Sequence, residues 1–296
     1  MKNTHVLGNG IERMQNISKA YTTSFTGKLN KVPFDTWDNL GPAASIISNV
    51  TDLSNWLIMQ LDSGKYNQQR IMPWSVIQKT RDINITYNSR KSSVYPIHFQ
   101  GYGLGVFVGD YNGRQLYWHT GGASGMVSNV CFVPEENLGI AILTNNDNQN
   151  FFEALRYQIL DAYLGVPFVN RSTQQLSNFE KGEAIALKEI EALKERMKNN
   201  ATPLAITEYT GEYTNQLYGK IMITNNGNQL NVSFKSHNNL TATIDYLDNN
   251  EWLLQYNNIL YGIFPLKFKI KNMKVVSVDI KANDFIEYDP YTFIKK

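Results

Sequence analysis

The sequence contains a single cysteine, Cys131, which lies in the apolar run VCFVP. One cysteine excludes an intramolecular disulfide framework and a cysteine-based metal cluster. A reactive thiolate also needs an exposed setting and a basic partner, and an apolar strand supplies neither. We therefore expect Cys131 to be a small core residue.

The sequence also has no long runs of Lys and Arg. Its 28 Lys and Arg residues nearly balance its 26 Asp and Glu residues, which gives a formal net charge of +2. Nucleic acid is therefore not expected as the main partner. No segment approaches the roughly 20 consecutive apolar residues of a membrane-spanning helix. The N-terminus MKNTHVLGNG lacks the pattern of a secretory signal, so the sequence assigns no compartment.

Metal-ligand spacings are also absent. His5, His98 and His237 are isolated in the sequence and form no His-x-x-x-His or Cys/His pattern. The sequence thus predicts no metal site and no cofactor. Its 296 residues, 42% of them hydrophobic, suit one large or two ordinary globular domains.

Helix and strand patterns alternate in the first part of the chain. Asn49 caps an amphipathic run that Gly64 ends, and a short helix is expected at 74–79. Strands separated by turn residues follow within 101–144, and a helix over 151–164 has Phe152, Leu155, Ile159 and Tyr163 on one face. This pattern predicts an antiparallel sheet packed by helices.

The last part of the chain has an almost purely β pattern. A highly charged helix over 179–199, with a narrow apolar stripe, looks like a connector. After Pro203, about eight short strands alternate with Asn-rich turns, which predicts a small closed antiparallel barrel or a sandwich. We expect its aromatic residues to form core and rim: Tyr209, Tyr213, Tyr218, Trp252, Tyr256, Tyr261 and Phe264.

The most informative motif is His119-Thr120-Gly121-Gly122, where apolar strand residues lead into a glycine-rich turn. The glycines clear a strand edge, so that a ligand can reach its N–H groups. His119 and Thr120 offer an imidazole and a hydroxyl, expected on the same side of a cleft, for an anionic or carbonyl-bearing substrate. The alternative is an ordinary hairpin turn with a surface histidine.

Three blocks around this motif occur in a characteristic order: GPAASIISNVTDLSNWLIMQL, GYGLGVF and LYWHTGGASGMVSNVCFVPEENLGIAILTN. In this order they resemble the serine β-lactamase and penicillin-binding-protein-like hydrolases, in the class C-like branch. The closing segment TEYTGEYTNQLYGKIMI resembles the lipocalin-like domain that often follows them. The resemblance implies an α+β fold with a partial hydrolase domain at 1–168, a linker with the charged helix at 169–202, and a lipocalin-like barrel at 203–296.

The resemblance also implies roles for single residues. His119, Thr120 and Gly121 align with the family's third motif, which binds the substrate carboxylate or helps to shuttle protons. The backbone N–H of Gly122 aligns with one half of the oxyanion hole. The implied activity is acyl-enzyme hydrolysis of peptidoglycan-like peptides, esters or β-lactams, by proteins that are typically exported in bacteria.

The chain departs from the family pattern at the nucleophile. No Ser-x-x-Lys occurs, because Ser75 and Lys79 are four positions apart, as are Ser177 and Lys181. A Tyr-x-Asn match at 256–258 lies in the all-β segment. We therefore expect a truncated chain that begins inside the hydrolase domain and is inactive alone. Either its first forty residues pack poorly, or it self-associates through an incomplete sheet.

Other nucleophiles are disfavoured. Gly122 to Met126 starts like a G-x-S-x-G elbow but ends in Met. A triad of His119 with Ser124 or Ser128 would also need an orienting carboxylate. Asp110 and Asp147 are candidates only because they are nearby in the sequence. Two further functions stay open: a noncatalytic binding module, and a ligand-carrying C-terminal barrel.

Overall fold

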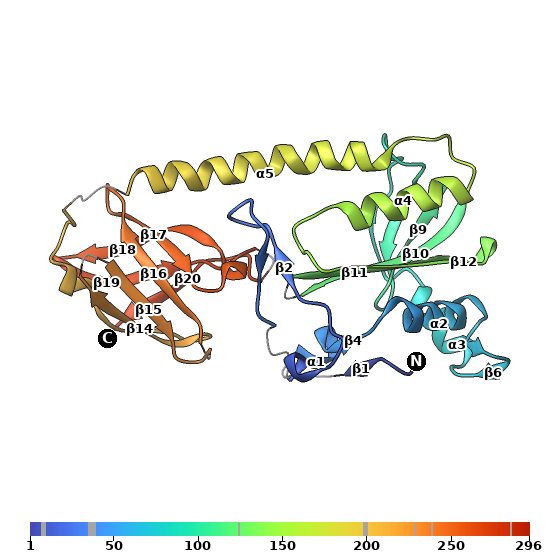
Figure 1. Cartoon of the computed structure of the whole chain (residues 1–296), viewed down its shortest axis with the longest axis horizontal. Coiled ribbons are helices and arrows are strands. Elements are labelled where there is room, and N and C mark those ends of the chain that lie inside the picture. The colour runs from blue at the N-terminus through green and yellow to red at the C-terminus, as the bar shows by residue number, and fades with distance from the viewer. Residues whose placement is uncertain are drawn as a thin grey trace. The chain divides into compact units, whose positions relative to one another are not determined.

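The computed structural model divides the chain into two compact units (Figure 1). The N-terminal unit comprises Met1–Tyr21 and Phe34–Phe179, and the barrel unit comprises Thr22–Pro33 and Glu180–Lys296. The domain boundaries at 168 and 202 stay predictions. The structure describes residues 1–6, 10–34, 40–123, 125–197, 201–227, 229–237, 239–284 and 286–296.

The N-terminal unit is built on a six-stranded antiparallel sheet with the order β12-β11-β10-β9-β8-β7. Asn112 and Gly113 join β9 to β10 with φ angles of 48° and 77°, as a tight two-residue hairpin requires. The strands expected within 101–144 are thus confirmed. Their bounds are β7 Ile85–Asn88, β8 Gln100–Tyr102, β9 Phe107–Tyr111, β10 Arg114–Ala123, β11 Met126–Val133 and β12 Leu138–Thr144.

Helices cover both faces of this sheet, with α4 (Phe151–Tyr163) on one side and α2 (Val50–Leu61) on the other (Figure 1). Alternation along β10 accounts for the two cores, because Trp118 packs in the α4 cluster and Tyr117 packs with Leu57 of α2. The predicted N-cap of α2 is confirmed, since the Asn49 side chain accepts a hydrogen bond of 2.9 Å from the Asp52 N–H.

The predicted apolar face of α4 is only partly right. Phe152, Leu155 and Ile159 pack against the core, but Tyr163 is 66% exposed. The face against the sheet is centred instead on Tyr157 and Leu160, so the last turn of the helix carries Tyr163 away from it.

Short elements complete this unit. Ile11 and Ala20 are buried, but most described residues of the first forty are exposed or partly exposed, so burial contradicts the expected poor packing only at a few positions. The Asp52 carboxylate also accepts hydrogen bonds from the N–H groups of Lys2 and Asn3. The short elements of the chain up to α3 are β1 His5–Val6, η1 Ile11–Arg13, β2 Tyr21–Thr22, β3 Asn30–Lys31, α1 Gly41–Ala44, β4 Ile46–Ile47, β5 Lys65–Tyr66, β6 Gln69–Arg70 and α3 Trp74–Arg81; η3 Pro134–Glu136 follows β11.

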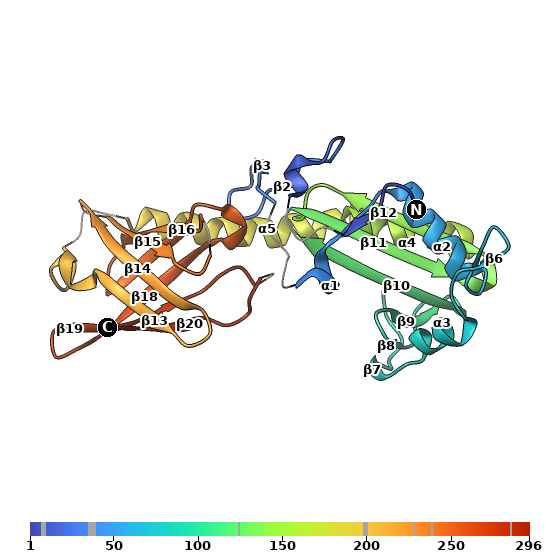
Figure 2. The same ribbon diagram turned by 90° about the horizontal axis from the view of Figure 1, so that it is seen from below.

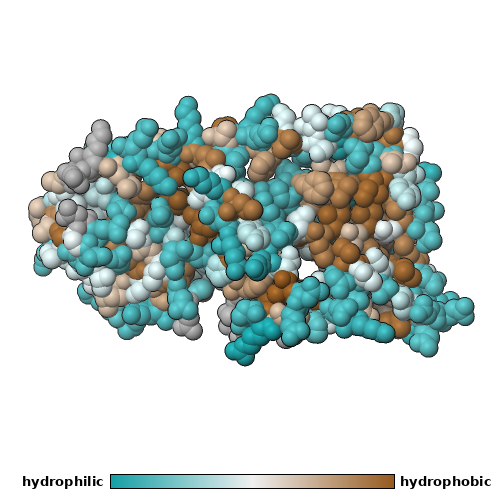
Figure 3. Space-filling view, in the orientation of Figure 1, coloured by the Kyte–Doolittle hydropathy of each residue, from teal (hydrophilic) through white to brown (hydrophobic). Residues whose placement is uncertain are grey.

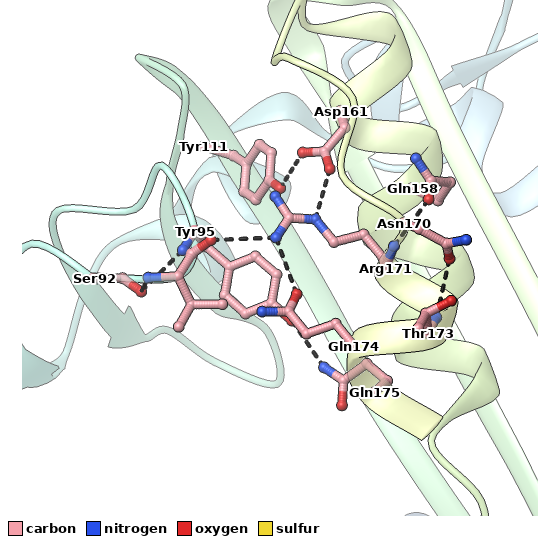
Figure 4. Close-up of polar contacts among 11 residues, drawn as sticks. Ser92, Tyr95, Tyr111, Gln158, Asp161, Asn170, Arg171, Thr173, Gln174 and Gln175 are labelled. Atoms are coloured by element: carbon pink, nitrogen blue, oxygen red, sulfur yellow. Dashed lines mark hydrogen bonds and ion pairs between the residues drawn. The ribbon is translucent and has the colours of Figure 1, made fainter. Parts of the chain in front are cut away.

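A buried ion pair links α4 to the first turn of α5 (Arg171–Glu195) (Figure 4). Arg171 Nε donates to Asp161 Oδ2 over 2.7 Å, and the Tyr111 hydroxyl donates to Asp161 Oδ1 over 2.5 Å. Asp161 and Arg171 are only 1% and 2% exposed. Burial and this hydrogen bond raise the pKa of Tyr111 well above its usual range.

Helix α5 begins before the predicted start at 179. Asn170 precedes it and its side chain accepts a hydrogen bond from the Thr173 N–H over 3.0 Å, which is the signature of a helix N-cap. The end of the predicted helix, at 198–199, lies outside the described residues.

The barrel unit contains a closed antiparallel barrel of eight strands, so the predicted strand series is confirmed and the barrel, rather than the sandwich, is correct. The barrel closes where β13 pairs with β20. Its elements are η4 Ile206–Tyr209, β13 Gly211–Asn215, β14 Gly219–Asn226, β15 Gln229–Phe234, β16 Thr241–Tyr246, β17 Glu251–Tyr256, η5 Ile259–Tyr261, β18 Ile263–Lys271, β19 Lys274–Ile280 and β20 Tyr291–Lys295.

Large side chains fill the barrel interior. Trp252, Tyr209, Tyr213 and Phe268 are all less than 3% exposed and lie in one core cluster. The Tyr209 ring centroid lies 4.7 Å from that of Trp252 and 5.0 Å from that of Phe268. The expectation that the aromatics form core and rim is confirmed for the buried Tyr209, Tyr213, Trp252, Tyr256 and Tyr261, and for Tyr218, which at 39% exposed belongs to the rim.

The barrel unit also takes in an early segment of the chain, Thr22–Pro33. The ring of Phe25 meets that of Phe264 edge-on, with centroids 5.6 Å apart. Phe25 also packs against a cluster that includes Ile190 of α5 and Ile263 of β18. Residues more than two hundred positions apart therefore share one apolar cluster.

Candidate functional site

The motif His119-Thr120-Gly121-Gly122 lies within strand β10, not in a turn. It pairs with β11 in continuous register, from His119 opposite Val130 to Gly122 opposite Val127. The expected glycine-rich turn is therefore wrong for Gly121 and Gly122, because pairing with β11 outweighs the turn preference of glycine. The Gly125 backbone, with a φ of 76°, does adopt a turn conformation, whereas Ser124 lies outside the described residues.

The motif has an unpaired strand edge. Strand β10 pairs with β9 only from Arg114 to Trp118, whereas it pairs with β11 as far as Ala123. In the described part of the chain, no strand pairs with the other edge of β10 beyond Trp118. A strand edge of this kind presents backbone N–H and C=O groups to a ligand or to another strand.

The sheet face at this end is also uncovered. Helix α2 covers the opposite end, where a Cβ on Gly139 would lie 3.1 Å from the Cβ of Leu57. In the view from below, α2 lies over one end of the strands and α1 lies near the other end (Figure 2). Gly121 is exposed, and so is Leu143, at 37%. Apolar side chains gather on the surface over α4 and the adjacent strands (Figure 3).

His119 is held by a tyrosine from a neighbouring strand. The Tyr102 hydroxyl lies 2.8 Å from His119 Nε2, and the Phe107 ring centroid lies 5.4 Å from that of the imidazole. Strands β8 and β9 bring these two aromatic residues to the free end of β10. This contact engages Nε2 of the imidazole and leaves Nδ1 for a further hydrogen bond.

Thr120 contacts a different strand. The Asn129 side chain donates from Nδ2 to Thr120 Oγ1 over 2.8 Å, so the threonine hydroxyl hydrogen remains available for another acceptor. Asn129 is fully buried, and its Oδ1 has no hydrogen-bond partner among the described residues. This amide oxygen could accept a hydrogen bond from an ordered water or from a ligand.

Consecutive strand residues point to opposite faces of a sheet. The different partners of His119 and Thr120, Tyr102 and Asn129, fit this alternation. The expectation that both side chains lie on the same side of a cleft is therefore wrong. They can contact one ligand together only if that ligand lies along the free edge of β10.

The carboxylate considered for a triad, Asp110, is engaged elsewhere. It accepts hydrogen bonds from the His98 N–H, from His98 Nδ1 and from the Phe99 N–H, at 2.7, 2.7 and 3.1 Å. Burial alone would raise the pKa of Asp110, but these hydrogen bonds outweigh it and lower that pKa. Asp110 thus orients His98, not His119.

Cys131 is fully buried on β11, as expected for a core residue. Burial raises the pKa of its thiol to about 12, so the thiolate is not populated near neutral pH. Among the described residues, no three His, Cys, Asp or Glu side chains form a group that could hold a metal ion.

Comparison with known proteins places this fold in a family. A model of the β-lactamase family matches residues 1–164, which is more than half of the chain. The chain belongs to the β-lactamase family. No curated protein matches this β-lactamase-family chain.

Solved structures resemble the chain at low identity. The octameric penicillin-binding protein homologue from Pyrococcus abyssi is 18% identical, with a TM-score of 0.45, over 99% of this chain and 56% of that one. SurE is 14% identical, with a TM-score of 0.35, over 96% of this chain and 58% of that one. This β-lactamase-family chain thus spans little more than half of the length of these structures.

The family's tyrosine motif matches this β-lactamase-family chain only in the barrel. Tyr256-Asn257-Asn258 begins at the end of β17, and the Tyr256 hydroxyl donates to the Lys281 carbonyl. A second match, Tyr213-Thr214-Asn215, could also have been found in the sequence and lies on β13, where the buried Tyr213 hydroxyl donates to the Tyr209 carbonyl. In the described part of the chain, no helix is long and apolar enough to span a membrane.

Proposed function

We propose that the free edge of β10 at His119–Gly122 is the substrate-binding wall of a serine β-lactamase-like hydrolase. The unpaired edge beyond Trp118 is the observation that carries this proposal. A peptide-like substrate or a β-lactam lies along this edge and takes the place of a neighbouring strand. The family acts on peptidoglycan-like peptides, esters or β-lactams, and we propose this substrate class here.

Three residues of the motif then have roles. The Gly122 N–H donates to the substrate carbonyl oxygen, where negative charge develops during acyl transfer. The Thr120 hydroxyl, with Asn129 as its second partner, binds a substrate carboxylate. His119, held by Tyr102, contacts the substrate from the opposite face of the strand and positions it along the edge.

The sequence limits this proposal to binding. No Ser-x-x-Lys occurs in it, so the sequence does not supply the family's serine nucleophile and lysine base for acyl-enzyme formation. We propose that residues 1–168 provide this wall, that 169–202 link it to the barrel, and that 203–296 form a lipocalin-like domain. A noncatalytic binding module is the second candidate, which the same missing motif favours.

Backbone NMR during titration with benzylpenicillin or an acyl-D-alanyl-D-alanine peptide tests the binding wall. We expect the amide signals of Gly121 and Gly122 to shift, and the His119→Ala variant to weaken binding roughly tenfold, as loss of one charge-assisted contact predicts. The matched control is His5→Ala on β1. Shifts confined to other strands, or equal affinity in both variants, would refute the proposal.

Intact-mass measurement after incubation with a fluorophosphonate or with penicillin tests the chemistry. We expect binding without covalent mass gain for this polypeptide. A stable adduct on Ser128 or Ser124 would identify that serine as a nucleophile and contradict this expectation. If the NMR titration shows no binding at all, the second candidate, a noncatalytic binding module, is contradicted as well.

Self-association is a second use that we propose for the same edge, since an unpaired strand is a template for pairing with another copy. Sedimentation velocity over a range of concentrations tests it. We expect a concentration-dependent dimer that the substitution Thr120→Pro abolishes, because proline removes a backbone donor from the edge. A monomer at all concentrations contradicts this part.

A further inference from the structure

The hairpin formed by β18 and β19 concentrates the positive charge of the barrel. Residues 203–296 contain nine lysines and nine acidic residues, so their formal charge is balanced. Four of the nine lysines are exposed on this one hairpin. Leu266 and Phe268 point into the barrel core, and the lysines alternate with them on the outside, at positions 267, 269, 271 and 274.

Most of this charge is not neutralised within the fold. Lys267 is 3.0 Å from Glu251 Oε1, but within the described residues no ion pair involves Lys269, Lys271 or Lys274. The hairpin's own carboxylate, Asp279, accepts a hydrogen bond from the Thr292 hydroxyl over 2.6 Å.

Two features of the hairpin tip are unfavourable for folding, and the contacts within the barrel do not offset them. Lys271 and Lys274 are direct cross-strand partners, and like charges placed opposite each other are unfavourable. Met273 has a φ of 60°, in the left-handed region where this turn favours glycine. Its side chain is 71% exposed, so it adds no burial in return.

We propose that the β18–β19 hairpin docks on an anionic lipid surface. The three unpaired lysines contact lipid phosphates, and Met273 enters the boundary between headgroups and acyl chains. The apolar side chain at the tip favours a lipid surface over a soluble polyanion, which would require the lysines alone. This inference is independent of the β10 site, because it uses no residue of that site.

Vesicle co-sedimentation of the full chain tests the lysines. We expect binding to vesicles of equal parts phosphatidylcholine and phosphatidylglycerol, and none to pure phosphatidylcholine. Replacing Lys269, Lys271 and Lys274 with Gln should weaken binding roughly 100-fold, since each lysine near an anionic surface contributes about fivefold. The control replaces three exposed lysines of the same barrel by Gln: Lys220, Lys235 and Lys296.

The substitution Met273→Gly tests the tip. Glycine suits the left-handed turn, so the variant should melt no lower than the parent, yet bind the anionic vesicles roughly fivefold more weakly. One outcome would refute the lipid proposal. If Met273→Gly binds the vesicles as tightly as the parent does, and the parent also binds dextran sulfate, the hairpin is a site for soluble polyanions.

The control triple variant completes the test. If it loses as much vesicle binding as the hairpin variant, only net charge matters and the hairpin has no special role. Circular dichroism of each variant establishes that the barrel is folded before binding is compared.

Discussion

The two units of this protein solve the problem of strand edges in opposite ways. Each strand of the barrel has two neighbours, because β13 pairs with β20 and closes the ring. In the N-terminal unit, β10 loses one neighbour after Trp118. Closure satisfies every strand, whereas the open sheet leaves backbone groups free for a ligand. Binding along a strand is therefore expected in the N-terminal unit, not in the barrel.

The interiors of the two units also differ, in the polarity of the groups that they bury. Fully buried aromatic side chains fill the barrel, which weakens the idea of a ligand carrier. The N-terminal unit instead buries polar groups, including the Asp161–Arg171 ion pair and the Asn129 amide. Buried polar groups add specificity at a cost in stability, and they are where single substitutions do most harm.

The largest effect is expected from Trp252→Ala in the barrel. Removal of this fully buried ring should destabilise the barrel by about 5 kcal/mol, through lost burial and a remaining cavity. Urea unfolding followed by circular dichroism measures the loss. If the units fold independently, the urea midpoint at which Cys131 of the N-terminal unit becomes accessible to a thiol reagent should be the same in the variant and the parent. If this midpoint falls as much as the midpoint of the barrel does, the two units unfold together.

A somewhat smaller effect, about 3–4 kcal/mol, is expected from Asp161→Ala, because it leaves the Arg171 guanidinium buried without its carboxylate. Cys131 labelling in urea measures this loss in the N-terminal unit. The exposed pair of Lys79 and Asp82 provides the control, since Asp82→Ala should cost less than about 1 kcal/mol. Equal losses in the two variants would contradict the role of burial.

Ionisation of Tyr157 at alkaline pH should have a smaller effect. Burial raises the pKa of Tyr157 to about 12, whereas an unfolded tyrosine titrates near 10. The folded state therefore retains a proton that the unfolded state releases, and Tyr157 alone lowers stability by roughly 2 kcal/mol at pH 12. The raised pKa values of Tyr111 and Cys131 act in the same direction. Urea unfolding of the parent and of Tyr157→Phe between pH 10 and 12 measures the Tyr157 share, and the variant should lose less stability than the parent without becoming independent of pH.

The smallest effect, about 1 kcal/mol, is expected from Asn49→Ala, which removes the cap of α2. Because α2 covers only the far end of the sheet, substrate binding at β10 should persist in this variant. Ligand titration of Asn49→Ala checks this, and a loss of binding would mean that α2 shapes the site.

Local patterns predicted much of the fold. The Asn49 cap, the eight barrel strands and buried Cys131 follow from short-range spacing and composition. The turn predicted at Gly121 and Gly122 was wrong. The turn preference of glycine is a local property, whereas the strand conformation of these residues comes from pairing with Ser128 and Val127.

Long-range partners could not be predicted in this way. The contact of Tyr102 with His119 depends on three strands lying in order, and the ion pair of Asp161 with Arg171 depends on two helices meeting. Tyr102 lies in the block GYGLGVF, so its position in a strand was within reach of sequence reasoning. Its partner was not, since nothing in the spacing ties residue 102 to His119.

The early segment Thr22–Pro33 has a consequence for how the protein is made. Phe25 leaves the ribosome long before Phe264, its ring partner in the barrel unit. At a synthesis rate of about 5–20 residues per second, the wait between them is roughly 10–50 s. During that time Phe25 lacks its partners from the barrel strands, and a chaperone could shield it. Because Thr22–Pro33 belongs to the barrel unit, a single cut in the gene cannot separate the two units cleanly.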